Sequence, residues 1–134
     1  MAEIGKSRKP RSCVLEVTLG CNLRCLHCGS RAGVARPDEL STSELQGVLV
    51  QLADLGCERV TISGGEPTTR SDWLQLIGFA ARLGLRVGMF TNALAFDRGA
   101  ARRARERGLE SVALSVDGVP STHDRVRGRV GHFQ

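Results

Sequence analysis

The chain has 134 residues, enough for one domain, and its 41% hydrophobic and 25% charged residues are an ordinary balance for a globular protein. No apolar run is long enough to span a bilayer, and the polar start "MAEIGKSRKPRSC" lacks the apolar segment of a secretory signal, so we expect a cytoplasmic protein with no membrane partner. The net charge of +5 comes largely from two basic segments, but only 4% of residues are aromatic, which disfavours nucleic acid as a partner.

The first predicted strand covers residues 13–19, "CVLEVTL", and follows a basic tail over residues 1–11. After a loop that contains three cysteines, Ser41 and Glu44 form a capping box, which predicts a helix that starts there and ends near Gly56. The apolar face of this helix repeats at helical spacing and consists of Leu45, Val48, Leu49, Leu52 and Leu55.

The next predicted elements are a strand over residues 58–63 and a helix that Ser71 caps and Gly84 ends. A third strand over 85–92, a third helix that opens at Asp97 and ends at Gly108, and a fourth strand over 111–118 follow. The remaining residues, 119–134, are expected to form a loop that leads to another helix. The core-facing residues expected in the second helix are Trp73, Leu74, Ile77, Ala80 and Ala81.

This alternation of strands and helices predicts an α/β fold with about four parallel strands and three to four helices, either barrel-like or doubly wound. Functional residues of such sheets gather beyond the C-terminal ends of the strands. Here an unusual segment follows each predicted strand: the three cysteines, "GGEP" at 64–67, "TN" at 91–92 and "SVDG" at 115–118. Because four strands do not close a barrel, we expect the chain to be truncated, as the front part of a larger domain or a natural short relative of one.

Cys21, Cys25 and Cys28 lie in one loop, and three thiols cannot all form disulfides with one another. A structural zinc ion needs four ligands, so His27 or an outside group would have to supply the fourth. A [4Fe–4S] cluster has four irons, so three thiolates leave one iron open to bind a substrate or cofactor. The cluster is the favoured interpretation, and the zinc site is the alternative.

The cysteines spell C-x-x-x-C-x-x-C after the first strand, and "GGEP" follows the second. In this order the two motifs resemble those of the radical S-adenosylmethionine (radical SAM) superfamily. The stretch "HDRVRGRVGHF" at 123–133 resembles members that carry a SPASM or twitch extension. The resemblance covers residues 12–134 and implies the N-terminal portion of a radical SAM core domain, a partial (β/α) barrel.

The resemblance implies that the three cysteines ligate a [4Fe–4S] cluster whose open iron chelates the amino and carboxylate groups of S-adenosyl-L-methionine. Gly64 and Gly65 would let the backbone approach the methionine part closely, and Glu66 would accept a hydrogen bond from its ammonium group. His27 matches a position that packs against adenine. The other candidates, for polar contacts with the methionine or the ribose, are Asn92, Ser115 and Asp117.

The implied activity is reductive cleavage of the cofactor to methionine and a 5′-deoxyadenosyl radical, which abstracts hydrogen from a peptide or small-molecule substrate. The cleavage step requires no general base, so no catalytic side chain is assigned. The implied partners are an electron donor such as flavodoxin or ferredoxin, the substrate, and a further chain that completes the barrel. Two alternatives stay open: an inactive or partner-dependent cluster-binding fragment, and a structural zinc-binding module.

Overall fold

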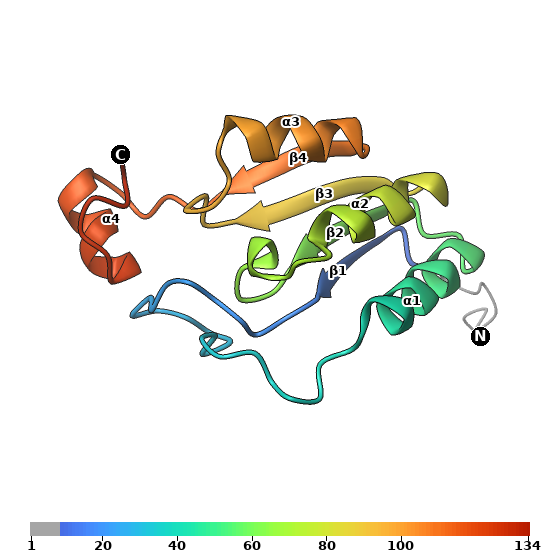
Figure 1. Ribbon diagram of the computed structural model, residues 1–134, viewed down its shortest axis with the longest axis horizontal. Coiled ribbons are helices and arrows are strands. Elements are labelled where there is room, and N and C mark those ends of the chain that lie inside the picture. Colours follow the sequence, from blue (N-terminus) through green and yellow to red (C-terminus); the bar gives the residue numbers. More distant parts are fainter. Residues whose placement is uncertain (1–8) are drawn as a thin grey trace, which may run out of the picture.

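The computed structural model describes residues 9–134, so most of the predicted basic tail lies outside the described residues. One sheet of four parallel strands has the order β1-β2-β3-β4 (Figure 1). The strands are β1 (Ser12–Glu16), β2 (Arg59–Ser63), β3 (Arg86–Thr91) and β4 (Leu109–Leu114). The helices are α1 (Thr42–Asp54), α2 (Trp73–Arg82), α3 (Arg98–Glu106) and α4 (Pro120–Arg127), and a short 3-10 helix, η1, covers Pro67–Thr69. The predicted α/β architecture is therefore confirmed.

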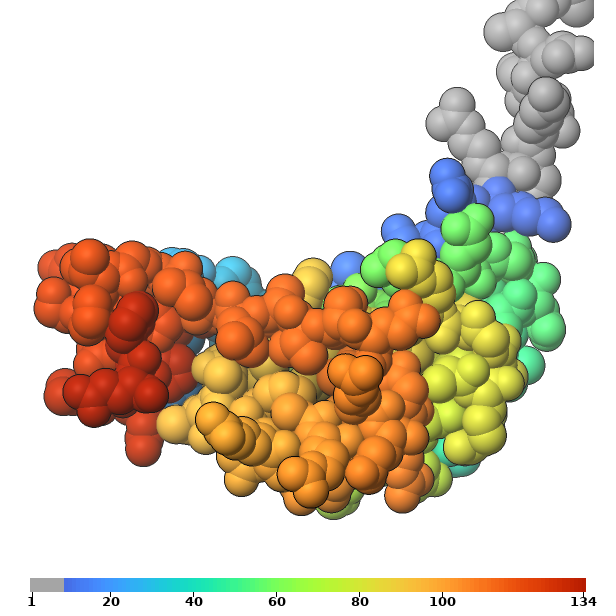
Figure 2. Space-filling model, turned by 90° about the horizontal axis from the view of Figure 1, so that it is seen from above, coloured from blue at the N-terminus to red at the C-terminus, as the bar shows by residue number. Residues whose placement is uncertain are grey.

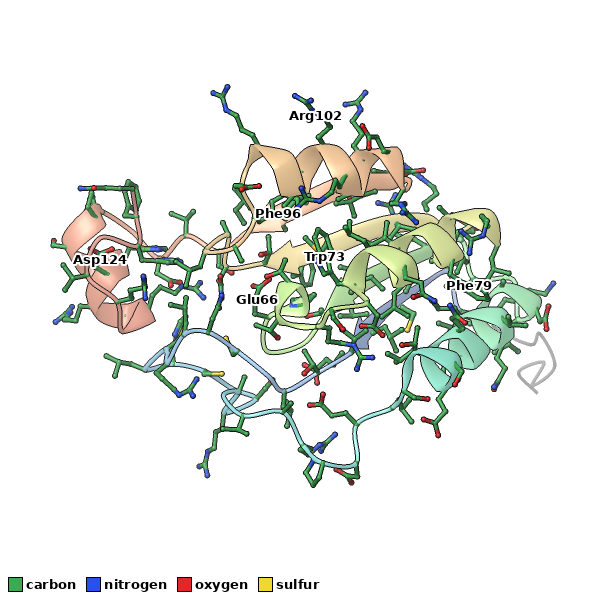
Figure 3. The ribbon with its side chains drawn as sticks, in the orientation of Figure 1. Glu66, Trp73, Phe79, Phe96, Arg102 and Asp124 are labelled. Atoms are coloured by element: carbon green, nitrogen blue, oxygen red, sulfur yellow. The ribbon has the colours of Figure 1, made fainter. Side chains whose placement is uncertain are left out.

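The core lies between the sheet and the helices that connect its strands. Val60 and Ile62 of β2 are fully buried, and Leu76 and Ile77 of α2 pack into the same cluster. Trp73 is 8% exposed and packs edge-on against Phe96, with ring centroids 6.1 Å apart (Figure 3). Burying side chains of this size provides most of the stabilisation of the domain.

None of the helices within residues 9–134 has the length and apolar character that a membrane crossing requires.

The opposite face of the sheet carries exposed side chains. Val14 on β1 is 57% exposed, and Phe90 on β3 is 46% exposed. Leu114 pairs with Thr91 and so belongs to the helix-covered face, and it is 57% exposed because β4 is an edge strand. Beyond the C-terminal ends of the strands, α4 and the last residues form a separate lobe (Figures 1 and 2). The loop with the three cysteines lies at this same end of the sheet (Figure 1).

The helix starts confirm two of the three predicted caps. Ser41 and Glu44 form the expected capping box at α1. The Asp97 carboxylate accepts a hydrogen bond from Ala100 N at 2.7 Å and caps α3. The prediction for Ser71 was wrong, because Asp72 occupies the N-cap position of α2.

The remaining differences concern the ends of elements. Leu55 was expected on the buried face of α1, but it is the C-cap residue and is 56% exposed, because the helix ends before its side chain returns to the core. The first strand ends at Glu16 rather than at residue 19, since the backbone of residues 18–20 turns to bond the loop after β2. The fourth strand covers Leu109–Leu114 instead of 111–118, and the SVDG segment follows it as a connection to α4.

Candidate functional site

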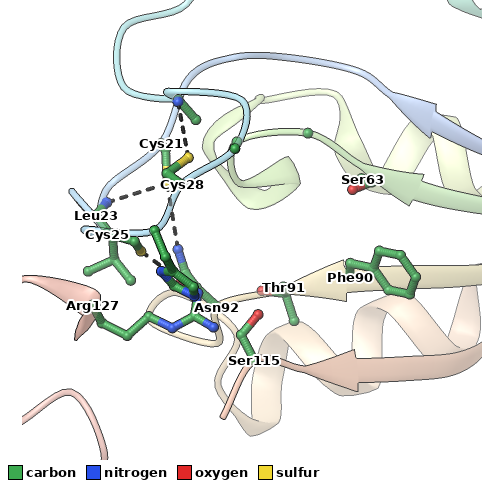
Figure 4. Close-up of a pocket in the computed structure, with 15 residues that line it drawn as sticks. Cys21, Leu23, Cys25, Cys28, Ser63, Phe90, Thr91, Asn92, Ser115 and Arg127 are labelled. Carbon is green, nitrogen blue, oxygen red and sulfur yellow. Dashed lines mark hydrogen bonds between the residues drawn. The ribbon is translucent and has the colours of Figure 1, made fainter. Parts of the chain in front are cut away.

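A cavity of about 310 Å³ lies at the C-terminal ends of the strands (Figure 4). Its lining includes all three cysteines of the predicted motif, together with His27, Gly64, Gly65, Asn92 and Ser115. The fold thus brings together residues that lie far apart in the sequence. Glu66 and Asp117 were also predicted as site residues, but they do not line this cavity.

The cysteine loop is closed at its neck by backbone hydrogen bonds. Gly20 and Gly33 form an isolated parallel bridge. Cys21 N donates to Gly33 O at 2.9 Å, and Gly33 N donates to Leu19 O at 2.8 Å. Because the two ends of the loop are held together, the residues between them are confined to one end of the sheet.

Each of the three sulfur atoms accepts at least one N–H group. The shortest donor contacts of Cys21, Cys25 and Cys28 are Leu23 N at 3.5 Å, Arg127 Nη1 at 3.8 Å and Ala32 N at 3.3 Å. Donors of this kind stabilise thiolates, which are the form that binds metals. Burial raises the pKa of the Cys21 thiol, and the neighbouring acidic groups raise it further, against the lowering effect of Leu23 N.

The chemistry of the donor set fits an iron–sulfur cluster. Thiols are the soft ligands that iron–sulfur clusters take, and among the described residues no carboxylate side chain lines the cavity beside them. Within residues 9–134, no three His, Cys, Asp or Glu side chains converge closely enough to hold a single metal ion. A cluster does not require such convergence, because each thiolate binds a different iron.

Gly64 and Gly65 pack directly against the backbone that leads into the cysteine loop. A Cβ atom on Gly64 would lie 2.4 Å from Thr18 O, and one on Gly65 would lie 2.4 Å from Gly20 O. The same segments are joined by hydrogen bonds from Gly65 N to Thr18 O at 2.7 Å and from Glu66 N to Gly20 O at 2.8 Å. The two glycines therefore allow the loop after β2 to pack against the start of the cysteine loop. The sequence did not reveal this reason for their presence.

The side chain of Glu66 is fully buried beside η1 (Figure 3). Its Oε1 accepts hydrogen bonds from Thr68 N at 3.2 Å, Thr68 Oγ1 at 2.7 Å and Thr91 Oγ1 at 2.9 Å. Its Oε2 accepts one from Asn92 N at 2.7 Å. Glu66 thus fixes the loop after β2 to the end of β3. Thr91, which the sequence analysis did not select as a site residue, is part of this connection.

Asn92 connects the end of β3 to the cysteine loop. Its Nδ2 donates to Asn22 Oδ1 at 2.8 Å and lies 3.9 Å from Cys21 Sγ. Its Oδ1 accepts from Leu94 N at 2.9 Å. The polar atoms of this side chain therefore all have protein partners, and they orient the loop around Cys21.

Asp117 contacts two basic side chains that line the cavity, His27 and Arg127. Its Oδ1 is 3.3 Å from Nε2 of His27, and its Oδ2 contacts Nε of Arg127. Although close, the second contact lacks hydrogen-bond geometry, so neither Oδ2 nor Nε has a hydrogen-bond partner among the described residues. The contact is therefore an ion pair without a hydrogen bond. Arg127 also lines the cavity, and the sequence analysis did not select it because its partners are distant in sequence.

Comparison with known proteins identifies the family. The family model of the radical SAM superfamily matches residues 15–134. The chain belongs to the radical SAM superfamily. The family predicted from the cysteine and GGE motifs is thus confirmed.

Curated relatives that share more than a third of their aligned residues with this radical SAM chain are considerably longer than it is. It is 37% identical over 134 residues to the Fe-coproporphyrin III synthase of Methanosarcina barkeri, a match that covers 99% of this chain and 33% of the relative. It is 35% identical over 125 residues to the sporulation killing factor maturation protein SkfB of Bacillus subtilis, covering 93% of this chain and 30% of the relative. The chain therefore spans about a third of the length of these curated relatives.

Solved structures confirm the fold. The structure of Streptococcus suis SuiB bound to S-adenosylmethionine matches with a TM-score of 0.77 at 22% identity, over 90% of this chain and 28% of that chain. SuiB bound to its precursor peptide SuiA matches with a TM-score of 0.76. At this identity the likeness concerns the fold alone, and it confirms the partial (β/α) barrel of the radical SAM type.

Proposed function

We propose that this chain binds a [4Fe–4S] cluster through Cys21, Cys25 and Cys28 and holds S-adenosyl-L-methionine beside it. The observation that carries the proposal is that these three side chains line one cavity together with Gly64 and Gly65. When reduced, the bound cluster would supply the electron that cleaves the cofactor to methionine and a 5′-deoxyadenosyl radical, which takes a hydrogen atom from the substrate. The chain's own residues bind, orient and shield these groups.

The proposed roles of the other site residues follow from their places in the cavity. His27 lines it and is oriented by Asp117, so its ring is available to pack against adenine. Ser115 and Asn92 also line it and are proposed to contact the methionine or the ribose. For Asp117 we propose an indirect role, because its carboxylate faces His27 and Arg127.

For Glu66 a direct contact with the cofactor ammonium remains a proposal. Oε2 accepts a single hydrogen bond and has a lone pair left for such a contact. The residue is nevertheless fully buried and already bonds Thr68, Thr91 and Asn92. We therefore propose that its main contribution is to hold Gly65 and Asn92 at the cavity.

The chain is proposed to act as the N-terminal portion, residues 12–134, of a radical SAM core domain in a cytoplasmic oxidoreductase. The exposed edge of β4 would pair with further βα units, supplied by additional sequence or by another chain. A peptide or small molecule is the proposed substrate, since the relatives include enzymes named PqqA peptide cyclase and AdoMet-dependent heme synthase. Flavodoxin or ferredoxin is the proposed electron donor.

Cofactor cleavage tests this proposal. The chain is reconstituted anaerobically with iron and sulfide, reduced with dithionite and incubated with S-adenosyl-L-methionine, and 5′-deoxyadenosine is measured by mass spectrometry. We expect product from the wild type and none from Cys25→Ala. Cys57→Ala is the matched control, because Cys57 is buried in the core away from the cavity. A cluster without cleavage would identify a partner-dependent fragment, and equal product from Cys25→Ala would refute the assignment of the ligand.

A further inference from the structure

The C-terminal end of α4 is seated on the cysteine loop. Leu26 N donates a hydrogen bond to Val126 O at 2.9 Å, so the loop and the helix are joined through their backbones. Gly128, which ends the helix at φ +70, would place a Cβ atom 2.6 Å from Arg24 O. Glycine is therefore needed for this contact, both for its positive φ and for the close approach of the two backbones. Arg127 lies between these two contacts.

The Arg127 side chain is only 12% exposed, and it reaches from α4 toward the cavity (Figure 4). Nη1 lies 3.8 Å from Cys25 Sγ. On its other edge, Nε forms the ion pair with Asp117. An arginine guanidinium carries a positive charge, and in partly buried surroundings that charge is weakly screened.

We propose that Arg127 is a positioning residue that holds Cys25 and raises the reduction potential of the cluster which Cys25 is proposed to ligate. The inference rests on the proposed function and extends it to control of the potential. Reduction adds a negative charge to a cluster that already carries thiolate ligands, and a fixed positive charge beside one sulfur stabilises the reduced form more than the oxidised form. Hydrogen bonds to the sulfurs and net charge are known determinants of cluster potentials.

Asp117 allows the direction of the shift in reduction potential to be tested. Its carboxylate lies on the Nε edge of Arg127, so it partly offsets the guanidinium charge. Removing Arg127 should lower the potential, whereas removing the Asp117 charge should raise it. A purely structural role of the two residues would not predict shifts in opposite directions.

The experiment measures iron per chain and the midpoint potential of the reconstituted cluster, by spectroscopic redox titration in the absence of S-adenosyl-L-methionine. The variants are Arg127→Gln, Arg127→Lys and Asp117→Asn. The control is Arg125→Gln, which removes the same charge from an exposed position of the same helix. We expect a lower potential in Arg127→Gln, a smaller decrease in Arg127→Lys, a higher potential in Asp117→Asn, and the wild-type value in the control.

Two results would overturn the inference while leaving the proposed function intact. One is a wild-type potential in Arg127→Gln at full iron content. If the affinity for S-adenosyl-L-methionine fell in that variant, the guanidinium would bind the cofactor and would not control the potential. The other is an equal shift in Arg125→Gln, which would indicate a general effect of charge. If Arg127→Gln fails to assemble a cluster, Arg127→Lys and Asp117→Asn decide by the signs of their shifts. A wild-type chain without a cluster would overturn the proposed function itself.

Discussion

Replacing Glu66 with glutamine should destabilise the whole domain as well as disturb the cofactor site. Both carboxylate oxygens accept backbone N–H groups: Oε1 from Thr68 and Oε2 from Asn92. A glutamine amide has one acceptor oxygen and one donor nitrogen. Whichever way the amide is turned, its NH₂ group therefore faces one of the two backbone N–H groups in a site with no exposure to water.

The expected loss follows from that one unpaired donor. Leaving a buried donor unsatisfied costs about 1–3 kcal/mol, so we expect Glu66→Gln to lower the free energy of unfolding by about 2 kcal/mol. This is a large fraction of the roughly 5–15 kcal/mol that stabilises a typical domain. The hydroxyls of Thr68 and Thr91 can rotate to accept from the amide, so they add little to the loss.

The assay is urea unfolding followed by circular dichroism, with Glu106→Gln as the control because Glu106 is an exposed glutamate on α3. The control should unfold within about 0.5 kcal/mol of the wild type, as exposed substitutions usually do. If Glu66→Gln were as stable as the control, the hydrogen-bonded connection between the loop after β2 and β3 would not contribute as described. If a Glu66→Gln variant of unchanged stability lost affinity for S-adenosyl-L-methionine, the loss would indicate a direct contact between Glu66 and the cofactor.

Three further predictions concern the packing and the pH dependence of the fold. Gly65→Ala should lower the melting temperature, with a loss of about 1–3 kcal/mol, because the new Cβ would meet backbone oxygen Gly20 O at 2.4 Å; an unchanged melting temperature by calorimetry would contradict this. Leu76→Ala, in the fully buried core, should cost about 2–5 kcal/mol in urea unfolding, and a loss below about 1 kcal/mol would mean that the site collapses to fill the cavity. Burial and the neighbouring His123 hold the pKa of His132 below its ordinary 6.5, so the folded state favours the neutral ring. The stability that this provides is complete above pH 6.5 and is lost as the pH falls through the folded-state pKa. His132→Gln should accordingly lose less stability than the wild type between about pH 7 and about pH 5, and parallel stability curves would count against this reasoning.

Local signals in the sequence were sufficient for the order of elements and for two helix caps. Ser41 and Asp97 each cap their helix through a residue three positions away, so the pattern alone identifies them. The predicted cap at Ser71 was wrong, and the N-cap residue Asp72 is held by side-chain contacts. Arg70 donates two hydrogen bonds to its carboxylate, of 2.8 and 2.7 Å. Thr42 of α1, which is distant in the sequence, donates a third at 2.6 Å. A prediction from neighbouring residues has no access to that long-range partner.

In the candidate site, too, local motifs were predictable and contacts between distant residues were not. The cysteines, Gly64 and Gly65 were predicted as site residues from motif spacing, and the fold places all of them on one cavity. Arg127 was not, since its contact with Cys25 joins residues 102 positions apart through the packing of α4 on the loop. Asp117 was expected at the cavity, but the fold turns its carboxylate to Arg127 and His27. Sequence spacing identified which segments meet, and only the structure reveals how their side chains pair.

The central claim is that the three thiols hold an iron–sulfur cluster with an open iron that binds S-adenosyl-L-methionine. The most direct measurement is the iron, sulfide and zinc content per chain after anaerobic reconstitution, combined with the paramagnetic resonance spectrum of the reduced sample. The account predicts about four irons and four sulfides per chain, with a signal that changes when S-adenosyl-L-methionine is added. Zinc without sulfide would contradict it, and would mean that Cys21, Cys25 and Cys28 serve a structural site instead.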